Sequence, residues 1–260
     1  MGLAPLVAAV VLAASPVSFV QSHAANGAFA ESGGTADALL TSWAVLGLRA
    51  AGAPAPGSLD YLRSQEATLS SPTDVALVAL AEQALGARND ALLAKLAPAP
   101  SGRMGPTLNS TYWSVLALGR ATAATRSYLL AHQARSGGFA WAVGAQPDSN
   151  DTAAALEALR VARVRGAPVA RAVRFLRTFQ NRDGGFELTH GRGSDAQSTA
   201  WAIQGFVAAG VKPPRSAFAY LARLRQPDGS YRYSAQYATT PVWVTSQVLA
   251  ALAHRAFPFS

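Results

Sequence analysis

The sequence contains no cysteine among its 260 residues. Structural disulfides, thiolate metal sites, cysteine nucleophiles and internal thioesters are therefore excluded. Histidine is also rare, and its four positions are scattered along the chain: His23, His132, His190 and His254. Without thiolates or a histidine cluster, we expect the protein to hold no metal and no cofactor.

Lysine is nearly absent, and charged residues make up only 14% of the chain. The net charge of +8 comes almost entirely from arginine, which could attract nucleic acid, an anionic polymer or a membrane. The arginines are dispersed except in one region, which contains Arg160, Arg163, Arg165, Arg171, Arg174 and Arg177. We interpret this region as solvated charge on an outer helix. No nucleic-acid-binding motif accompanies it, so we expect no nucleic-acid partner.

Long apolar runs are absent beyond the N-terminal segment. The stretch from Leu3 to Val20 is apolar and is followed by Ser22-His23-Ala24, a small-x-small pattern. We therefore predict a signal peptide over residues 1–24, cleaved after Ala24, and a secreted or cell-surface protein. A basic segment before the apolar stretch is missing, so an uncleaved membrane anchor and a buried helix stay open as alternatives.

Hydrophobic residues make up half of the chain, and alanine is abundant. A chain of this length can bury one sizeable core, and alanine favours closely packed helices. We therefore expect residues 25–260 to form a single all-α domain and the protein to be a monomer.

The chain is built from six copies of one unit. Gly-Gly-Phe triplets begin at Gly137 and Gly184, 47 residues apart, and the same distance separates Thr152 from Thr199. In the six units, the position of this threonine is occupied in turn by Thr41, Val75, Thr111, Thr152, Thr199 and Thr245. Two positions later three units have tryptophan, and four positions earlier three have aspartate: Trp43, Trp113 and Trp201, and Asp37, Asp148 and Asp195. This shared register indicates a repeat protein.

Each unit reads as a turn, a loop, a helix, a turn and a second helix. The first helix is apolar nearly all round, whereas the second is amphipathic. The second helices are predicted over residues 57–65, 88–97, 122–133, 167–180 and 214–226. Fully apolar helices that alternate with amphipathic ones indicate two concentric layers. We therefore predict an α/α toroid of six helix pairs, with an inner and an outer ring.

Recurring polar residues have simple structural roles in such a ring. Ser194 and Gln197 fit a capping box, and Ser71 and Thr240 each stand as a helix cap before a proline. The recurring threonine is expected to bond backbone atoms. The recurring tryptophan is expected either to fill the inner layer or to line a cavity.

The repeat resembles the prenyltransferase/squalene-oxidase repeat, and the resemblance covers about residues 26–257. It implies the α/α toroid of terpene cyclases, protein prenyltransferase β-subunits and the thioester domains of complement-like proteins. The lack of cysteine excludes the thioester role and removes one ligand of the zinc that the prenyltransferases use. Because such toroids host enzymes and binding proteins alike, the fold does not determine the activity.

The segment DSNDTAA, from Asp148 to Ala154, resembles the Asp-x-Asp-Asp-Thr-Ala motif of squalene–hopene cyclases, which are class II terpene cyclases. The resemblance places Asn150 where that family has its proton-donating aspartate. A neutral amide cannot act as a general acid. Asp148 and Asp151 are the remaining candidates for that chemistry, and they also suit the cap and first turn of an inner helix.

These observations favour a terpene-cyclase-like toroid that acts as a non-catalytic scaffold. It would bind an apolar or isoprenoid-like small molecule, or a protein or cell-envelope partner. One alternative is a small squalene-type cyclase that uses Asp148 or Asp151, and another is a glycan-binding or glycan-cleaving toroid that pairs one of them with Glu187. The expected pocket lies where the inner helices begin. Its candidate residues are Asp37, Trp43, Thr111, Trp113, Trp141, Thr152, Asp195, Trp201 and Tyr237.

Overall fold

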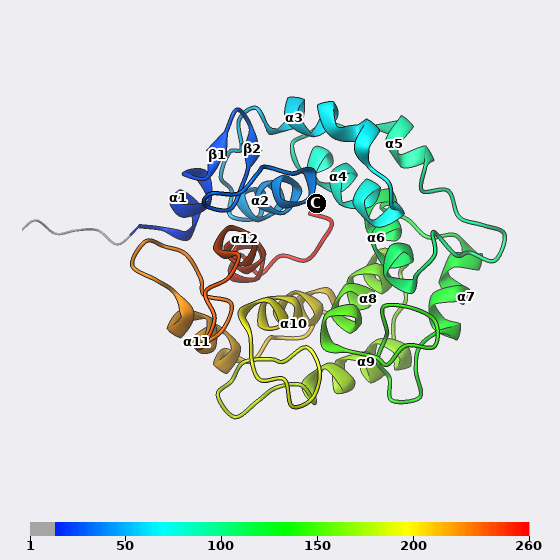
Figure 1. The fold of residues 1–260 in the computed structure, drawn as a ribbon. Helices are drawn as coiled ribbons and strands as arrows, with labels where there is room; N and C mark the ends of the chain where they lie inside the picture. The colour runs from blue at the N-terminus through cyan, green and yellow to red at the C-terminus, as the bar shows by residue number, and fades with distance from the viewer. Residues whose placement is uncertain (1–13, 260) are drawn as a thin grey trace, which may run out of the picture.

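The computed structural model describes residues 14–259, and six of its helices form a closed inner ring (Figure 1). In chain order these are α2 (Ala38–Ala50), α4 (Pro72–Ala84), α6 (Leu108–Leu118), α8 (Ser149–Val161), α10 (Ala196–Ala208) and α12 (Pro241–Leu252). Each helix packs against the next, and α12 packs against α2. The ring therefore has no open edge, and the predicted all-α toroid is confirmed.

A second set of helices surrounds this ring (Figure 1). They are α3 (Ser58–Gln65), α5 (Asp90–Ala94), α7 (Ala123–Ala131), α9 (Ala167–Arg177) and α11 (Arg215–Leu224), and a 3-10 turn, η1 (Glu66–Thr68), follows α3. Each lies within or close to a predicted second helix. No helix in the described part of the chain is long and apolar enough to cross a membrane.

The sixth outer position is occupied by α1 (Pro16–Gln21), which lies within the predicted signal peptide. This helix packs against α12 and α2 and buries Phe19 and Val20. The last inner helix is thus paired with a helix from the beginning of the sequence, which the repeat pattern did not indicate. Residues 1–13, the first part of the predicted signal peptide, lie outside the described residues.

A small hairpin connects α1 to the ring. Its strands, β1 (Ala24–Ala25) and β2 (Ala28–Phe29), pair antiparallel. Gly27 lies in the turn with a φ of +81°, and a Cβ atom there would lie 2.3 Å from the carbonyl oxygen of Gly57. Only glycine combines this backbone conformation with so close an approach.

The recurring threonines attach each loop to its inner helix. Their Oγ1 atoms accept a hydrogen bond from a backbone N–H in the loop before the helix, at 2.9–3.1 Å. The pairs are Thr41 with Phe29, Thr111 with Met104, Thr152 with Phe139, Thr199 with Phe186, and Thr245 with Tyr231. All five threonines are buried, so each hydroxyl satisfies a backbone donor that water cannot reach. The predicted role in backbone bonding is confirmed.

The predicted caps of α4 and α10 have different outcomes. Ser71 caps α4, and its Oγ accepts the N–H of Asp74 at 3.1 Å. The prediction for Ser194 was wrong, because Asp195 is the cap of α10 and its Oδ1 accepts the N–H of Ser198 at 2.6 Å. The carboxylate is the stronger acceptor for the N–H groups at a helix start.

The start of α12 is capped by a residue near the beginning of the chain. Thr240 has a φ of 45° and makes no side-chain cap, so its predicted role was wrong. Instead, the carboxylate of Glu31 accepts the N–H groups of Val242 at 2.9 Å and Trp243 at 2.8 Å. A residue before α2 therefore stabilises the start of α12.

Candidate functional site at the ring centre

The three recurring tryptophans meet inside the ring. Trp43, Trp113 and Trp201 come from α2, α6 and α10, which are alternate inner helices. Their ring centroids lie 5.5–5.7 Å apart in every pair, with interplanar angles of 86–88°. This is a mutual edge-to-face arrangement, in which the positive edge of one ring meets the negative face of another. The tryptophans therefore pack against one another across the axis.

The other three inner helices have non-aromatic residues at the matching position. These are Leu77 in α4, Ala154 in α8 and Gln247 in α12, all buried. Alternation of large and smaller side chains around the ring lets three indoles fit at one level. Of the two roles considered for the recurring tryptophan, the structure shows the filled layer.

A fourth aromatic residue closes the centre on the side where the inner helices end. The segment after α12 turns into the ring (Figure 1) and carries Phe257, which is buried. Its ring centroid lies 6.0 Å from that of Trp43, 6.2 Å from Trp113 and 6.3 Å from Trp201. The tail thus covers the tryptophan cluster.

Two side chains of α8 hold this tail. Glu157 Oε1 accepts the backbone N–H of Phe257 at 3.1 Å. Arg160 Nη2 donates to the carbonyl oxygens of Ala256, Phe257 and Pro258 at 3.2, 2.6 and 3.2 Å. Burial raises the pKa of Glu157 to about 8, although the N–H of Phe257 and the charge of Arg160 oppose the shift. The carboxyl is therefore mostly protonated at neutral pH.

The acidic motif lies at the start of α8. Asp148 caps the helix, and its Oδ1 accepts the N–H of Asp151 at 2.8 Å. Asp151 is buried, and its Oδ1 accepts a hydrogen bond from Asn109 Nδ2 at 2.7 Å. Asn150 is partly exposed, and its Oδ1 accepts the hydroxyl of Ser149 at 3.2 Å. Each side chain of the motif therefore has a partner within the helix start or on α6.

The electrostatics of this motif do not suit a strong acid. Burial, followed by the charge of Asp148, raises the pKa of Asp151 to about 8. Burial also raises the pKa of Asp148. Protonation of an alkene needs a strong acid, whereas a carboxyl with a raised pKa releases its proton reluctantly. Asp151 thus holds its proton near neutral pH without being a strong proton donor.

The remaining predicted site residues do not form one pocket. Asp37 is exposed and caps α2 by accepting the N–H groups of Leu39 and Leu40. Trp141 is 57% exposed on the loop before α8 and takes no part in the tryptophan cluster. Thr111 and Thr152 are buried in their loop contacts, as described above.

Asp195 and Tyr237 share a separate polar cleft of about 720 Å³. Tyr220 of α11, Tyr233 and Gln236 also line it. Burial raises the pKa of Asp195, although its hydrogen bonds from Ser198 oppose the shift. This cleft is polar and rich in tyrosine, unlike the ring centre.

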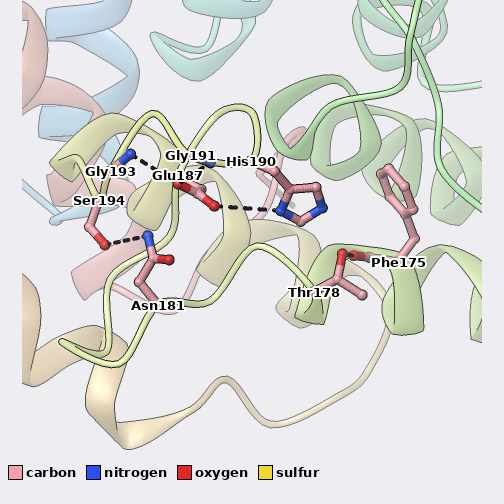
Figure 2. A network of polar contacts seen from close by, with 8 residues as sticks. All are labelled: Phe175, Thr178, Asn181, Glu187, His190, Gly191, Gly193 and Ser194. Carbon is pink, nitrogen blue, oxygen red and sulfur yellow. Dashed lines mark hydrogen bonds and ion pairs between the residues drawn. The ribbon is translucent and has the colours of Figure 1, made fainter.

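Glu187 is engaged within its own loop (Figure 2). One carboxylate oxygen accepts the N–H groups of Gly191 at 3.1 Å and Gly193 at 2.9 Å, and the other lies 3.5 Å from His190 Nδ1. Burial raises the pKa of Glu187, but these N–H groups, together with the side chains of Asn181 and His190, outweigh it, so the net shift is downward. The loop adjoins the acidic motif, since Ser149 donates its N–H to the carbonyl oxygen of Leu188 at 3.1 Å.

No protein-family model matches the chain, and no curated protein sequence matches it. Solved structures do resemble it. A type II terpene cyclase from Scytonema, in complex with its substrate geranylgeranyl dihydroxybenzoate, has a TM-score of 0.63 and 14% identity, over 92% of this chain and 94% of the other. A glycosidase in complex with glucose has a TM-score of 0.62 and 14% identity, over 92% and 94%.

A third similar structure is an ent-copalyl diphosphate synthase from Streptomyces platensis, with a TM-score of 0.59 and 20% identity. The match covers 84% of this chain but only 50% of the synthase, so this chain corresponds to about half of that enzyme. At these identities the likeness concerns the fold. The fold is that of the terpenoid-cyclase-like α/α toroids.

The residues that close the ring centre were not identified from the sequence. Phe257 lies after the last repeat unit, so the repeat register says nothing about it. Glu157 did carry a signal, because it is a carboxyl among the alanines and leucines in the middle of an inner helix. A charged residue at such a position is unusual unless it has a partner.

Proposed function

We propose that this protein is a non-catalytic binding scaffold built on a terpene-cyclase-like toroid. The observation that supports this proposal is the filled ring centre. Trp43, Trp113 and Trp201 meet across the axis, and Phe257 covers them. A polyprenyl substrate would need a space of its own inside the ring, and these four side chains take up its centre.

The acidic motif supports the same proposal. Asn150 stands at the position of the cyclase proton donor and offers only a neutral amide. Asp151 has a pKa raised to about 8, which makes it a weak acid for alkene protonation. The scaffold would bind an apolar or isoprenoid-like molecule, as the Scytonema cyclase does, or a protein or cell-envelope partner, through a surface outside the filled centre.

A cyclase assay tests the proposal. The native chain, Asn150→Asp, a chain that ends at His254, and the combination of both changes are incubated with squalene and geranylgeranyl dihydroxybenzoate. We expect no product from the native chain. Product from the native chain, or from the shortened chain that retains Asn150, would overturn the scaffold proposal in favour of a small cyclase. Product only when Asn150→Asp is present would support a degenerate cyclase site.

A glycan-binding role is the second candidate, and the polar cleft around Asp195 and Tyr237 favours it. Tyr237 is 63% exposed there, as is common for aromatic side chains that stack on sugars. The structural similarity to a glycosidase is consistent with this candidate. Titration with glucose oligomers, with Tyr237→Ala as the variant, tests it. Saturable binding that Tyr237→Ala abolishes would establish a glycan-binding protein.

We also propose that the protein acts outside the cytoplasm, on the basis of its apolar N-terminal stretch. Cleavage after Ala24 would remove α1 and leave the contact surface of Phe19 and Val20 on the ring uncovered. Sequencing the N-terminus of the protein recovered from its native host distinguishes a cleaved signal peptide from a retained α1. A cytoplasmic protein that begins at Met1 would contradict the proposal.

A further inference from the structure

A cleft lies outside the ring centre, between the end of α8, the face of α9 and the end of α10. Its volume is about 740 Å³, within the range of about 300–1,000 Å³ found for small-molecule sites. Apolar side chains of all three helices and their following turns line it: Leu156, Val164, Val169, Val173, Ala208 and Val211. An apolar chain placed there would be removed from water.

The lining of this cleft carries five arginines and no acidic residue: Arg160, Arg163, Arg165, Arg174 and Arg177. The ion pairs within residues 14–259 are Arg88 with Asp90 and His190 with Glu187, so none involves the cleft. Like charges gathered without a counter-charge repel one another. An anion bound there would relieve that repulsion.

Two of the five arginines already have partners in the fold. Arg160 holds the tail through its carbonyl oxygens, and Arg177 lies 5.8 Å from the ring centroid of Phe206. No side-chain hydrogen bond to a described residue engages Arg163, Arg165 or Arg174, and all three are exposed at the cleft. Their guanidinium groups are therefore available to a ligand, and each can bind phosphate or carboxylate in a bidentate manner.

Arg163 occupies a left-handed backbone position, a conformation that favours glycine. It follows α8 with a φ of +57°. Glycine stands in the corresponding place after α2, α4 and α10 (Gly52, Gly86 and Gly210), and Gly119 follows α6 one position earlier, whereas α12 is followed by His254 with a φ of +53°. A long side chain is strained there, and a residue kept in such a conformation suggests a function for the side chain. In α8 this position sets a guanidinium group at the mouth of the cleft.

We propose that this cleft binds an amphipathic anion, with its apolar chain along the valines of α9 and its phosphate or carboxylate head at Arg163, Arg165 and Arg174. The cleft lies outside the ring centre. The tail of Phe257 is held by Arg160, which also lines the cleft, whereas the three arginines of the head-group site make no side-chain hydrogen bond to that tail.

Calorimetric titration with decyl phosphate below its critical micelle concentration tests this proposal. We expect saturable one-to-one binding that weakens as the salt concentration rises. Three compounds are the controls. Decanol lacks the phosphate head group, inorganic phosphate lacks the apolar chain, and decyltrimethylammonium lacks the negative charge. Equal affinity for decyltrimethylammonium, or no binding of decyl phosphate, would overturn the proposal.

Variants locate the site. Arg163→Gly removes a guanidinium group and relieves the strained backbone, so it should bind decyl phosphate about tenfold more weakly without a lower unfolding temperature. Arg126→Gln, on the exposed face of α7, removes the same charge away from the cleft and should bind as the native chain does. Equal losses in both variants would show a general charge effect and refute the site.

A further comparison distinguishes a single bound amphiphile from a membrane surface. Vesicles of anionic phospholipid present the same head-group charge with their chains held in the bilayer. We expect Arg163→Gly to weaken binding of decyl phosphate more than binding to vesicles. Binding to vesicles alone, without binding of monomeric decyl phosphate, would contradict the proposed occupant.

Discussion

The backbone N–H of Phe257 donates to Glu157 Oε1 at 3.1 Å, and the two residues are 100 positions apart in the chain. This bond places the tail of the chain across the tryptophan cluster of a terpene-cyclase-like ring. It connects a buried carboxyl to the residue that covers the ring centre, and the first two predictions concern these two residues.

Replacing Glu157 by glutamine should flatten the pH dependence of stability. The folded-state pKa of Glu157 is raised to about 8 from an ordinary value of 4.5. The unfolded chain therefore releases this proton first, and the folded state loses stability as pH rises from about 4.5 to about 8. Urea unfolding at pH 5, 6, 7 and 8 should show this loss in the native chain and a smaller one in Glu157→Gln.

The control for this experiment is Asp60→Asn, because Asp60 is an exposed carboxylate in the first turn of α3. Asp151 has a raised pKa as well, so Asp151→Asn should remove part of the remaining slope. If the native chain gains stability between pH 5 and 8, the described protonation of Glu157 is wrong.

Phe257→Ala should open the ring centre. The side chain is buried, and truncation of a buried phenylalanine costs about 3 kcal/mol in the free energy of unfolding. Water would then reach the indoles, so tryptophan fluorescence of the folded protein should shift to longer wavelength. Phe259→Ala, which removes a partly buried neighbour of the same tail, should have a smaller effect on both. An unchanged emission maximum in Phe257→Ala would contradict the prediction that Phe257 shields the tryptophans from water.

Glu31→Ala should destabilise α12. Its carboxylate accepts two N–H groups at the helix start, and loss of a helix cap costs about 1–2 kcal/mol. Thr240→Ala is the control, because Thr240 occupies the cap position without making a cap bond. Chemical denaturation should rank Glu31→Ala clearly below Thr240→Ala. The opposite order would restore the sequence-based view that Thr240 is the cap.

Removal of residues 1–24 should destabilise the ring, whereas removal of residues 1–13 should not do so to the same extent. The longer deletion removes α1 with its buried Phe19 and Val20, and it exposes the surface of α12 that they cover. Burial of two such side chains contributes roughly 3–6 kcal/mol. Thermal unfolding of the two truncated chains checks this. Equal unfolding temperatures would mean that α1 does not stabilise the ring.

The fold could be predicted because its signal recurs. Thr152 and Thr199 share one position of the repeat, and Trp113 and Trp201 share the position two residues later. The structure shows that the threonines anchor the loops and that the tryptophans form the central layer. Every unit repeats the same local physics, so agreement between copies compensated for the weakness of any one pattern.

The features that the sequence did not predict are contacts without a repeat. Glu31 caps a helix that begins 210 residues later, and Phe257 follows the last unit. Ser194 was wrongly placed as a cap because a serine and an aspartate stand side by side there, and hydroxyl and carboxylate patterns are equally good by spacing alone. The clustered arginines were interpreted as solvated charge, and the five that line the cleft are exposed, but the sequence did not predict that they surround one cleft.

The bond from Glu31 to the start of α12 also affects how the molecule can open. In a linear stack of repeats, the terminal unit has one neighbour and frays first. Here each inner helix has two neighbours, because α12 packs on α2 and is capped from the same side. Any unit that detaches must give up two interfaces at once. Amide hydrogen exchange in the first and last inner helices should therefore be as slow as in those between them.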